Sequence, residues 1–152
     1  MKIGVAADHG GYALKAELVQ ELKAQGYEVQ DFGPDHFDPA DDYPDFGIPA
    51  ARAVAAGVMD RAILICNNGI GMGILANKVE GVRAAVVYNE QSARDTREHH
   101  DSNVIALGGQ EFSADRLKGF IDIWLKAEFA GGRHERRMRK IMSLTTKETT
   151  QA

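Results

Sequence analysis

The sequence contains a single cysteine, which stands between an apolar run and a glycine-rich stretch. Residues 62–65 are apolar, and the residues that follow Cys66 are Asn67, Asn68, Gly69, Ile70, Gly71, Met72 and Gly73. A loop this rich in glycine can turn its N–H groups toward a ligand, because few side chains block the approach. The apolar residues from 74 onward predict a helix, whose N-terminus favours anions. A thiol, a group of amides and a helix dipole are therefore predicted to meet at one site.

Cys66 also has a purely structural interpretation. A free cysteine is commonly a small buried hydrophobe at the end of a strand. However, three glycines within five residues exceed what a simple strand-to-helix turn requires. The glycine density favours a ligand site.

Histidines and aspartates supply further groups for proton transfer. Asp8 and His9 precede Gly10 and Gly11, and these glycines would let a ligand come close. His99 and His100 stand at the end of a predicted helix, where they are either reactive groups or a solvated helix end.

A basic cluster occupies the last predicted helix. Arg133 and Arg137 are four residues apart and so share one helix face, where two guanidinium groups could hold phosphate oxygens. The alternative is an exposed helix face without a ligand. Together with the acid–base groups and the amide loop, this cluster suggests proton transfer on a small phosphorylated substrate.

The elements that must position these residues alternate along the chain. Apolar runs predict strands at 2–7, 27–32, 61–66, 82–88 and 103–107, and helical periodicity falls between them at 12–25, 45–56, 74–80, 91–100 and 112–129. This alternation predicts a three-layer α/β/α, Rossmann-like fold with a five-stranded parallel sheet, helices on both faces and a basic C-terminal helix at 134–144. The polar loop 33–42 is long enough to suggest a function, and residues 145–152 are expected to fray.

In such a sheet ligands bind at the carboxyl ends of the strands. Asp8, His9 and Cys66 follow predicted strands, and His99 ends the helix before another strand. We expect these element ends to converge on one site.

Bulk properties limit the function classes. The 152 residues suit one domain spanning 1–152, and the net charge of −4 argues against general nucleic-acid binding. No apolar run could cross a membrane, and the N-terminus lacks the pattern of a signal peptide. One cysteine suits a reducing compartment, so a cytoplasmic location is expected.

Several motifs occur in an order that is more specific than any one of them. They are Asp8-His9-Gly-Gly, Asp42-Tyr43-Pro44, Ile63-Leu-Ile-Cys66 with Gly69-x-Gly71, Ala76-Asn77-Lys78, Gly81-x-Arg83, Ser92-Ala93, His99, Asp101-x-Asn103 and Gly131-Gly-Arg-His134. In this order, over residues 2–142, the chain resembles the ribose-5-phosphate isomerase B family, which includes galactose- and allose-6-phosphate isomerases. The resemblance implies interconversion of ribose 5-phosphate and ribulose 5-phosphate through a cis-enediolate, without a metal or other cofactor. It also implies a homodimer or a dimer of dimers with shared active sites.

The resemblance also implies roles for individual residues. Cys66 would be the base that moves a proton between C2 and C1, since Met72 stands where one branch of the family has a glutamate base. His99 would open the sugar ring with help from Asp8, and the backbone amides of residues 67–71, Gly69 and Gly71 included, would stabilise the enediolate. Tyr43 would line the pocket. The residues that hold the phosphate would be His9, Arg133 and Arg137.

Four positions depart from the family pattern next to the substrate. Asn67 and Asn68 replace a glycine and a threonine or serine, His100 replaces an asparagine, and Gln110 replaces an arginine. The sugar is therefore open among ribose 5-phosphate, another pentose or a tetrose phosphate, and a hexose 6-phosphate. A non-catalytic protein that binds a sugar phosphate is a further alternative.

Two other classes fit less well. The segment from Gly71 to Ala76 matches a dinucleotide-binding pattern, but its first glycine lies five residues after Cys66 instead of directly after the strand. A thiol phosphatase needs an arginine six residues after the cysteine, where this chain has Met72.

Overall fold

The computed structural model describes residues 1–144, so the expectation of fraying at residues 145–152 lies outside the described part of the chain. Five strands form its sheet: β1 (Lys2–Ala7), β2 (Glu28–Asp31), β3 (Arg61–Cys66), β4 (Ala84–Val86) and β5 (Val104–Gly108). Within residues 1–144, six helices accompany them: α1 (Tyr12–Ala24), α2 (Pro44–Ala55), α3 (Ile70–Asn77), α4 (Glu90–Glu98), α5 (Ala114–Lys126) and α6 (Arg133–Met142).

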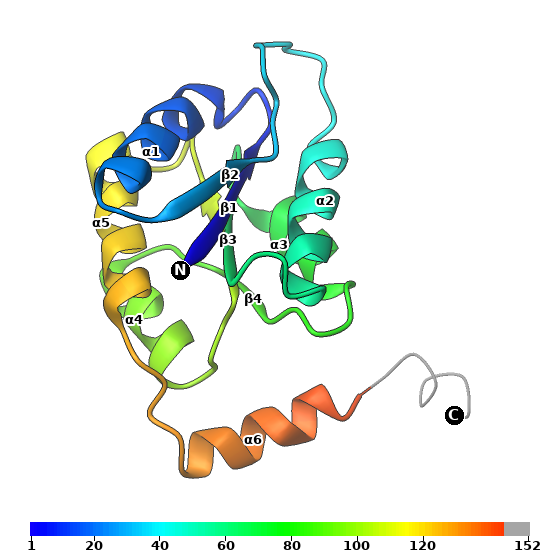
Figure 1. Ribbon diagram of the computed structural model, residues 1–152, viewed down its shortest axis with the longest axis vertical. Coiled ribbons are helices and arrows are strands. Elements are labelled where there is room, and N and C mark those ends of the chain that lie inside the picture. The colour runs from blue at the N-terminus through cyan, green and yellow to red at the C-terminus, as the bar shows by residue number, and fades with distance from the viewer. Residues whose placement is uncertain (145–152) are drawn as a thin grey trace.

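The sheet has the order β2-β1-β3-β5-β4, and every neighbouring pair is parallel. Helices α1, α4 and α5 cover one face, whereas α2 and α3 cover the other (Figure 1). The predicted Rossmann-like fold is confirmed. The prediction of a strand over 82–88 is wrong in length, because only Ala84–Val86 pairs with β5 at this edge.

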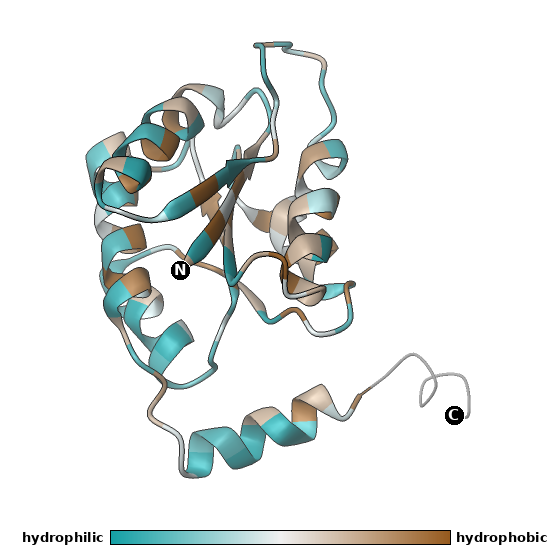
Figure 2. Ribbon diagram, in the orientation of Figure 1, coloured by the Kyte–Doolittle hydropathy of each residue, from teal (hydrophilic) through white to brown (hydrophobic). Residues whose placement is uncertain are grey.

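Alternate residues of the central strands face different helical layers. Ile63 and Ile65 of β3 pack toward α1 and α5, whereas Leu64 and Cys66 pack toward α2 and α3. Both sets are buried, which explains why these strands read as continuous apolar runs. Figure 2 shows the apolar sheet between helices whose outer surfaces are hydrophilic.

Helix α6 stands apart from these layers. It crosses the end of the molecule opposite the loop that joins β2 to α2 (Figure 1), and no residue of the helix is buried. A hydrogen bond from the Ala130 N–H to the Glu98 carbonyl ties the segment between α5 and α6 to α4. A mostly polar helix with this little packing has little stabilisation of its own in one chain.

Within residues 1–144, none of the helices has the length and hydropathy to span a membrane.

Candidate active site

Cys66 lies at the carboxyl end of β3, under the start of α3. Its side chain is buried, and its Sγ accepts a hydrogen bond from the Gly69 N–H at 3.2 Å. Gly69 has φ of 81°, a left-handed conformation that suits glycine, and it caps α3. The predicted meeting of a thiol with amides at a helix N-terminus is confirmed.

Gly71 and Gly73 were expected in a loop but belong to α3, because the helix begins at Ile70. Their missing side chains serve close packing instead. A Cβ on Gly71 would collide with the Tyr43 ring, and one on Gly73 would lie 2.9 Å from Val86 Cγ2. Gly71 thus lets Tyr43 lie against the start of α3.

Asn67 and Asn68 are exposed at the turn after Cys66. Asn68 Oδ1 accepts the Ile70 N–H at 3.0 Å and so occupies one of the amides at the N-terminus of α3. Asn67 lies against Gly10, where its Oδ1 takes the place that a Cβ would need. Gln110 meets the same backbone, since its Nε2 donates to the Gly10 carbonyl at 2.9 Å. Asn67 and Gln110, two of the four residues that depart from the family pattern, thus pack on the loop after β1.

Asp8 is buried at the carboxyl end of β1, and its Oδ1 accepts the Gly10 N–H at 2.8 Å. Burial raises the pKa of the Asp8 carboxyl, whereas the hydrogen bond from Gly10 and the neighbouring His9 oppose that shift. A carboxyl with a raised pKa can exchange protons with a substrate more readily than an exposed aspartate.

His9 is paired with Asp41, which the sequence analysis did not single out. Asp41 Oδ1 accepts both the backbone N–H of His9, at 3.0 Å, and its ring Nδ1–H, at 2.6 Å. The Asp41 hydrogen bond raises the pKa of His9, and the Asp8 carboxylate adds to the rise. The hint in the sequence was the long loop 33–42, but its several aspartates gave no basis for choosing Asp41.

A cavity of about 370 Å³ opens between these elements. Its lining residues are Asp8, Tyr43, Cys66, Asn67, Asn68, Ile70, Gly71 and Ile74. It therefore joins a thiol, a carboxyl and a helix N-terminus in a space suited to a small ligand.

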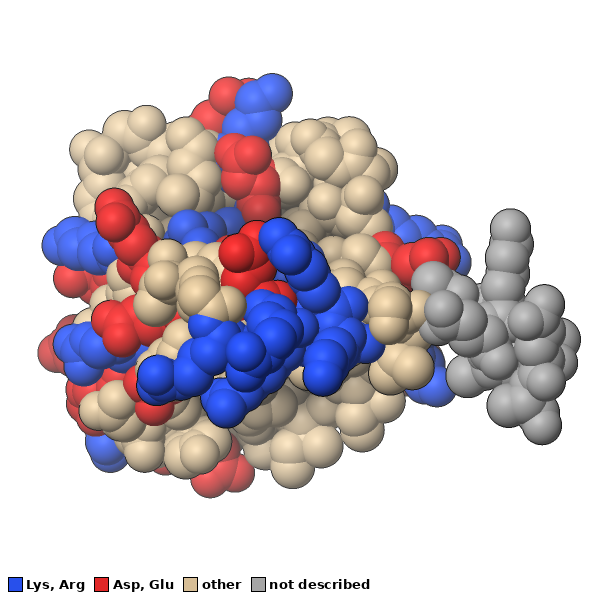
Figure 3. Space-filling model, turned by 90° about the horizontal axis from the view of Figure 1, so that it is seen from below, with Lys and Arg blue, Asp and Glu red and all other residues tan. Residues whose placement is uncertain are grey.

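A second group of predicted residues lies at the opposite edge of the sheet. His99 stacks on His134 of α6 with 4.3 Å between ring centroids, and the His100 ring meets His99 edge-on at 6.2 Å. Burial lowers the pKa of His134, and the neighbouring His99 lowers it further. Arg133 and Arg137 belong to α6, where Figure 3 shows lysine and arginine side chains gathered on the outer surface.

The expectation that these element ends converge on one site is therefore wrong for His99 within one chain, and His100 and the two arginines lie on the same side of the molecule as His99. Cys66 pairs with Gly108 at the carboxyl end of β5, whereas His99 precedes the amino end of that strand. The strand between them spans roughly 13 Å. The physical reason is direction: a helix that leads into a parallel strand ends at the amino edge of the sheet.

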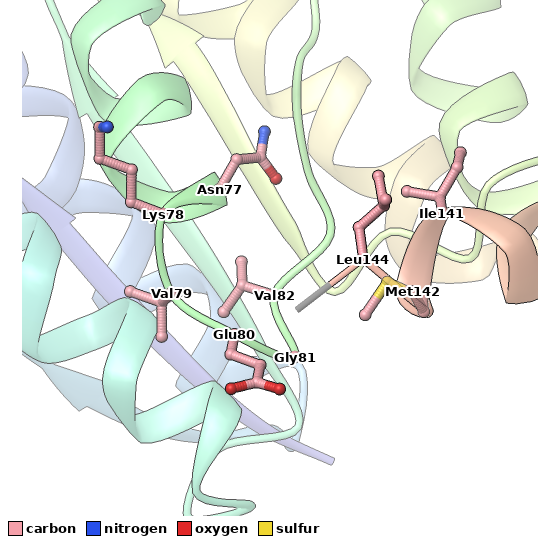
Figure 4. Close-up of a pocket in the computed structure, with 9 residues that line it drawn as sticks. All are labelled: Asn77, Lys78, Val79, Glu80, Gly81, Val82, Ile141, Met142 and Leu144. Carbon is pink, nitrogen blue, oxygen red and sulfur yellow. The ribbon is translucent and has the colours of Figure 1, made fainter. Parts of the chain in front are cut away.

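The end of α6 stands apart from the segment that joins α3 to β4. A cavity of about 440 Å³ lies there, lined by residues 77–82 and by Ile141, Met142 and Leu144 (Figure 4). Ile141 is 53% exposed and Leu144 is 70% exposed. The apolar side chains at the end of α6 are thus left largely uncovered by their own chain.

In the described part of the chain, two groups of side chains come close enough to share a metal ion. Asp8, His9 and Asp41 form one, and Asp95, Glu98 and His99 form the other, each with donor atoms within 4.8 Å. In the first group, His9 Nδ1 and Asp41 Oδ1 already bond to each other. The second group is only partly buried, and exposed acidic clusters commonly exist without a metal.

Comparison with known proteins gives consistent matches over nearly the whole chain. Residues 3–141 match the ribose/galactose isomerase family. Ribose-5-phosphate isomerase B of Escherichia coli is 41% identical over 143 residues, which cover 94% of this chain and 95% of that protein. The structure of Clostridium thermocellum ribose-5-phosphate isomerase B superposes with a TM-score of 0.92 at 50% identity, with both chains fully covered. The structure of the Mycoplasma genitalium enzyme with bound ribulose-5-phosphate gives 0.91 at 41% identity, covering 93% of this chain and 94% of that one.

Proposed function

The chain belongs to the ribose/galactose isomerase family, and we propose that it interconverts ribose 5-phosphate and ribulose 5-phosphate. It is an isomerase of the sugar-phosphate type. The observation that carries the proposal is the Cys66 thiol beside the N-terminus of α3 in a cavity of about 370 Å³. The similarity to an enzyme whose structure holds ribulose-5-phosphate supports the choice of sugar.

In this proposal Cys66 carries the proton. The thiolate removes the proton on C2 of the open-chain aldose, and the electron pair moves onto the C1 carbonyl to give a cis-enediolate. The thiol then returns its proton to C1, while the hydroxyl proton passes from O2 to O1. Amide N–H groups of the turn at residues 67–71 stabilise the negative oxygen, and the Gly69 N–H stabilises the thiolate.

The remaining groups bind the sugar and open its ring. Asp8 is buried beside the cavity and assists ring opening by His99, while Tyr43 borders the sugar. His9, Arg133 and Arg137 hold the phosphate. Binding energy from the phosphate can orient the reacting carbons, because it lies away from them.

His99 and the arginines reach the Cys66 cavity only if a second copy of the chain supplies them. We propose a homodimer, alone or paired into a dimer of dimers, in which α4 and α6 of one copy face the cavity of the other. Two features support this arrangement: the separation of the two groups along β5, and the exposed apolar end of α6. Covering that end would also compensate for the weak packing of α6 in its own chain.

Four residues that differ from the family pattern leave another sugar phosphate as the second candidate substrate. Asn67, Asn68, His100 and Gln110 differ from the family pattern, and Asn67 and Gln110 both contact the loop that bears His9. Another pentose or a tetrose phosphate, or a hexose 6-phosphate, would then be the substrate. We propose a cytoplasmic location, which suits metabolite conversion by a protein with one unpaired thiol.

The test is turnover of a panel of aldose phosphates with four, five and six carbons in D2O. Ketose formation and deuterium entry at the carbon next to the carbonyl are followed by NMR, with Cys66→Ala as the control. We expect ribose 5-phosphate to be converted and the variant to be inactive. Turnover of a different sugar instead would show that ribose 5-phosphate is not the substrate. Binding without turnover of any sugar would indicate a protein that senses a sugar phosphate and would contradict the enzymatic function.

A further inference from the structure

Asp41 lies near the end of the long loop between β2 and α2 and contacts His9, 32 positions earlier in the chain. Its side chain is only 8% exposed, and Oδ1 accepts two hydrogen bonds from His9, one from the backbone and one from the ring. Asp41 Oδ2 is buried and has no hydrogen-bond partner among the described residues. Within this part of the chain, both hydrogen bonds that the carboxylate accepts therefore come from His9.

These contacts fix how the imidazole is presented. The bond from Nδ1–H to a carboxylate sets the tautomer and orients the ring, which leaves Nε2 on the opposite side for another partner. The His9 side chain is 31% exposed, so an anion from solvent can reach it.

We propose that Asp41 is a positioning residue for substrate binding: it holds the His9 ring with Nε2 toward the phosphate and keeps that ring positively charged. This inference rests on the proposed function, in which His9 binds the phosphate of the sugar. The loop that carries Asp41 thereby gains a functional role beyond connecting β2 to α2.

The charges around His9 support the part of the proposal in which Asp41 keeps the His9 ring positively charged. Asp41 bonds to the ring, Asp8 Oδ2 lies 4.0 Å from Nδ1, and Asp38 of the same loop acts from farther away. All three carboxylates raise the pKa of His9, Asp41 most strongly, whereas burial opposes the rise. His9 therefore remains an imidazolium at pH values where a solvated histidine is neutral.

Asp41→Asn tests this with almost no change of shape. The amide oxygen can still accept the ring N–H, but the negative charge is lost. We expect KM for ribose 5-phosphate to rise about fivefold at pH 7.5 and less than about twofold at pH 6, with kcat little changed, because acid restores the charge on His9. Asp35→Asn is the matched control, since Asp35 lies on the same loop, is exposed and pairs with His36.

NMR titration of ring-labelled histidines gives a readout that does not depend on turnover. His9→Gln assigns the His9 signal, and inorganic phosphate serves as the probe ligand. We expect His9 of the wild-type protein to titrate above an ordinary histidine and to shift with phosphate, and Asp41→Asn to lower its midpoint.

Three results would overturn the inference: an ordinary His9 midpoint in the wild-type protein, an unchanged midpoint in Asp41→Asn, or a rise in KM that is equal at both pH values. The wild-type titration decides even if the variant does not fold. Failure of the proposed function looks different, since no aldose phosphate would be converted while the titration of His9 still responds to Asp41.

Discussion

The two edges of the sheet differ in how completely one chain builds them. At the carboxyl edge, Cys66, Asp8 and His9 are each held by hydrogen bonds to their own chain. At the amino edge, the His99 ring stacks on His134 of α6, and α6 has no buried residue. The carboxyl edge carries a cavity lined by Cys66 and Asp8, whereas the amino edge presents charged and apolar side chains outward.

This difference indicates which residues of the proposed site one chain can hold in place by its own contacts. Tight turns after β1 and β3 orient the acid–base groups before any ligand binds, which favours catalysis because little reorganisation remains. A basic helix with little packing can gain its order from a partner. In our proposal the carboxyl edge supplies the chemistry, and the amino edge of a second copy supplies ring opening and charge.

The largest expected effect is at the carboxyl edge. Cys66→Ala removes the proposed base and should lower kcat by about 10²- to 10⁴-fold, with the fold retained. Cys66→Ser is the matched control for structure, because it keeps an acceptor for the Gly69 N–H but is a much weaker base. Steady-state kinetics with circular dichroism measures both, and a near-normal kcat in Cys66→Ala would remove the thiol from its role.

A smaller effect is expected at the amino edge. Arg137→Ala removes a charge-assisted contact to the phosphate and should raise KM about tenfold to a hundredfold, with a smaller change in kcat. Arg139→Ala controls for charge on the same helix, since Arg139 pairs with Glu135 at 2.8 Å. Equal KM values for the two variants would exclude Arg137 from the phosphate site.

The smallest effect concerns stability at the carboxyl edge. Burial raises the pKa of Asp8, which means that folding favours the protonated carboxyl. The contribution of Asp8 to the free energy of unfolding is therefore fully present at low pH and is lost as pH rises through the raised pKa. Asp8→Asn keeps an acceptor for the Gly10 N–H without that charge. We expect its melting temperature to exceed that of the wild type by about 2 °C at pH 8 and to match it near pH 3, at a cost in activity.

Thermal unfolding at the two pH values measures this effect. Asp122→Asn is the control, because that carboxylate is exposed and pairs with Lys126. A lower melting temperature for Asp8→Asn at pH 8 would mean that the buried charge is net stabilising.

Sequence reasoning succeeded where local pattern decides structure. The apolar run that ends at Cys66 and the glycine that caps α3 predicted both a buried strand and its turn, because burial and backbone conformation leave direct traces in residue type. The start of α3 was misplaced, since Gly71 and Gly73 resemble loop residues but are small in order to pack against Tyr43 and Val86.

Long-range placement was harder to predict. Asp41 meets His9 across 32 positions, and no spacing rule distinguishes it from the other aspartates of its loop. His99 was placed on the wrong edge because the ends of elements were treated alike, although strand direction separates them. The family resemblance already implied a shared site, which is the arrangement that we propose to account for this separation.

Complementation between two inactive variants tests the shared site most directly. Cys66→Ala disables the carboxyl edge and His99→Asn disables the amino edge, and the two proteins are unfolded together and refolded as an equal mixture. About half of the dimers should be hybrids with one intact site of two, so activity should recover to about one quarter of the wild-type value. A mixture no more active than the separately refolded variants would contradict a site built from two chains.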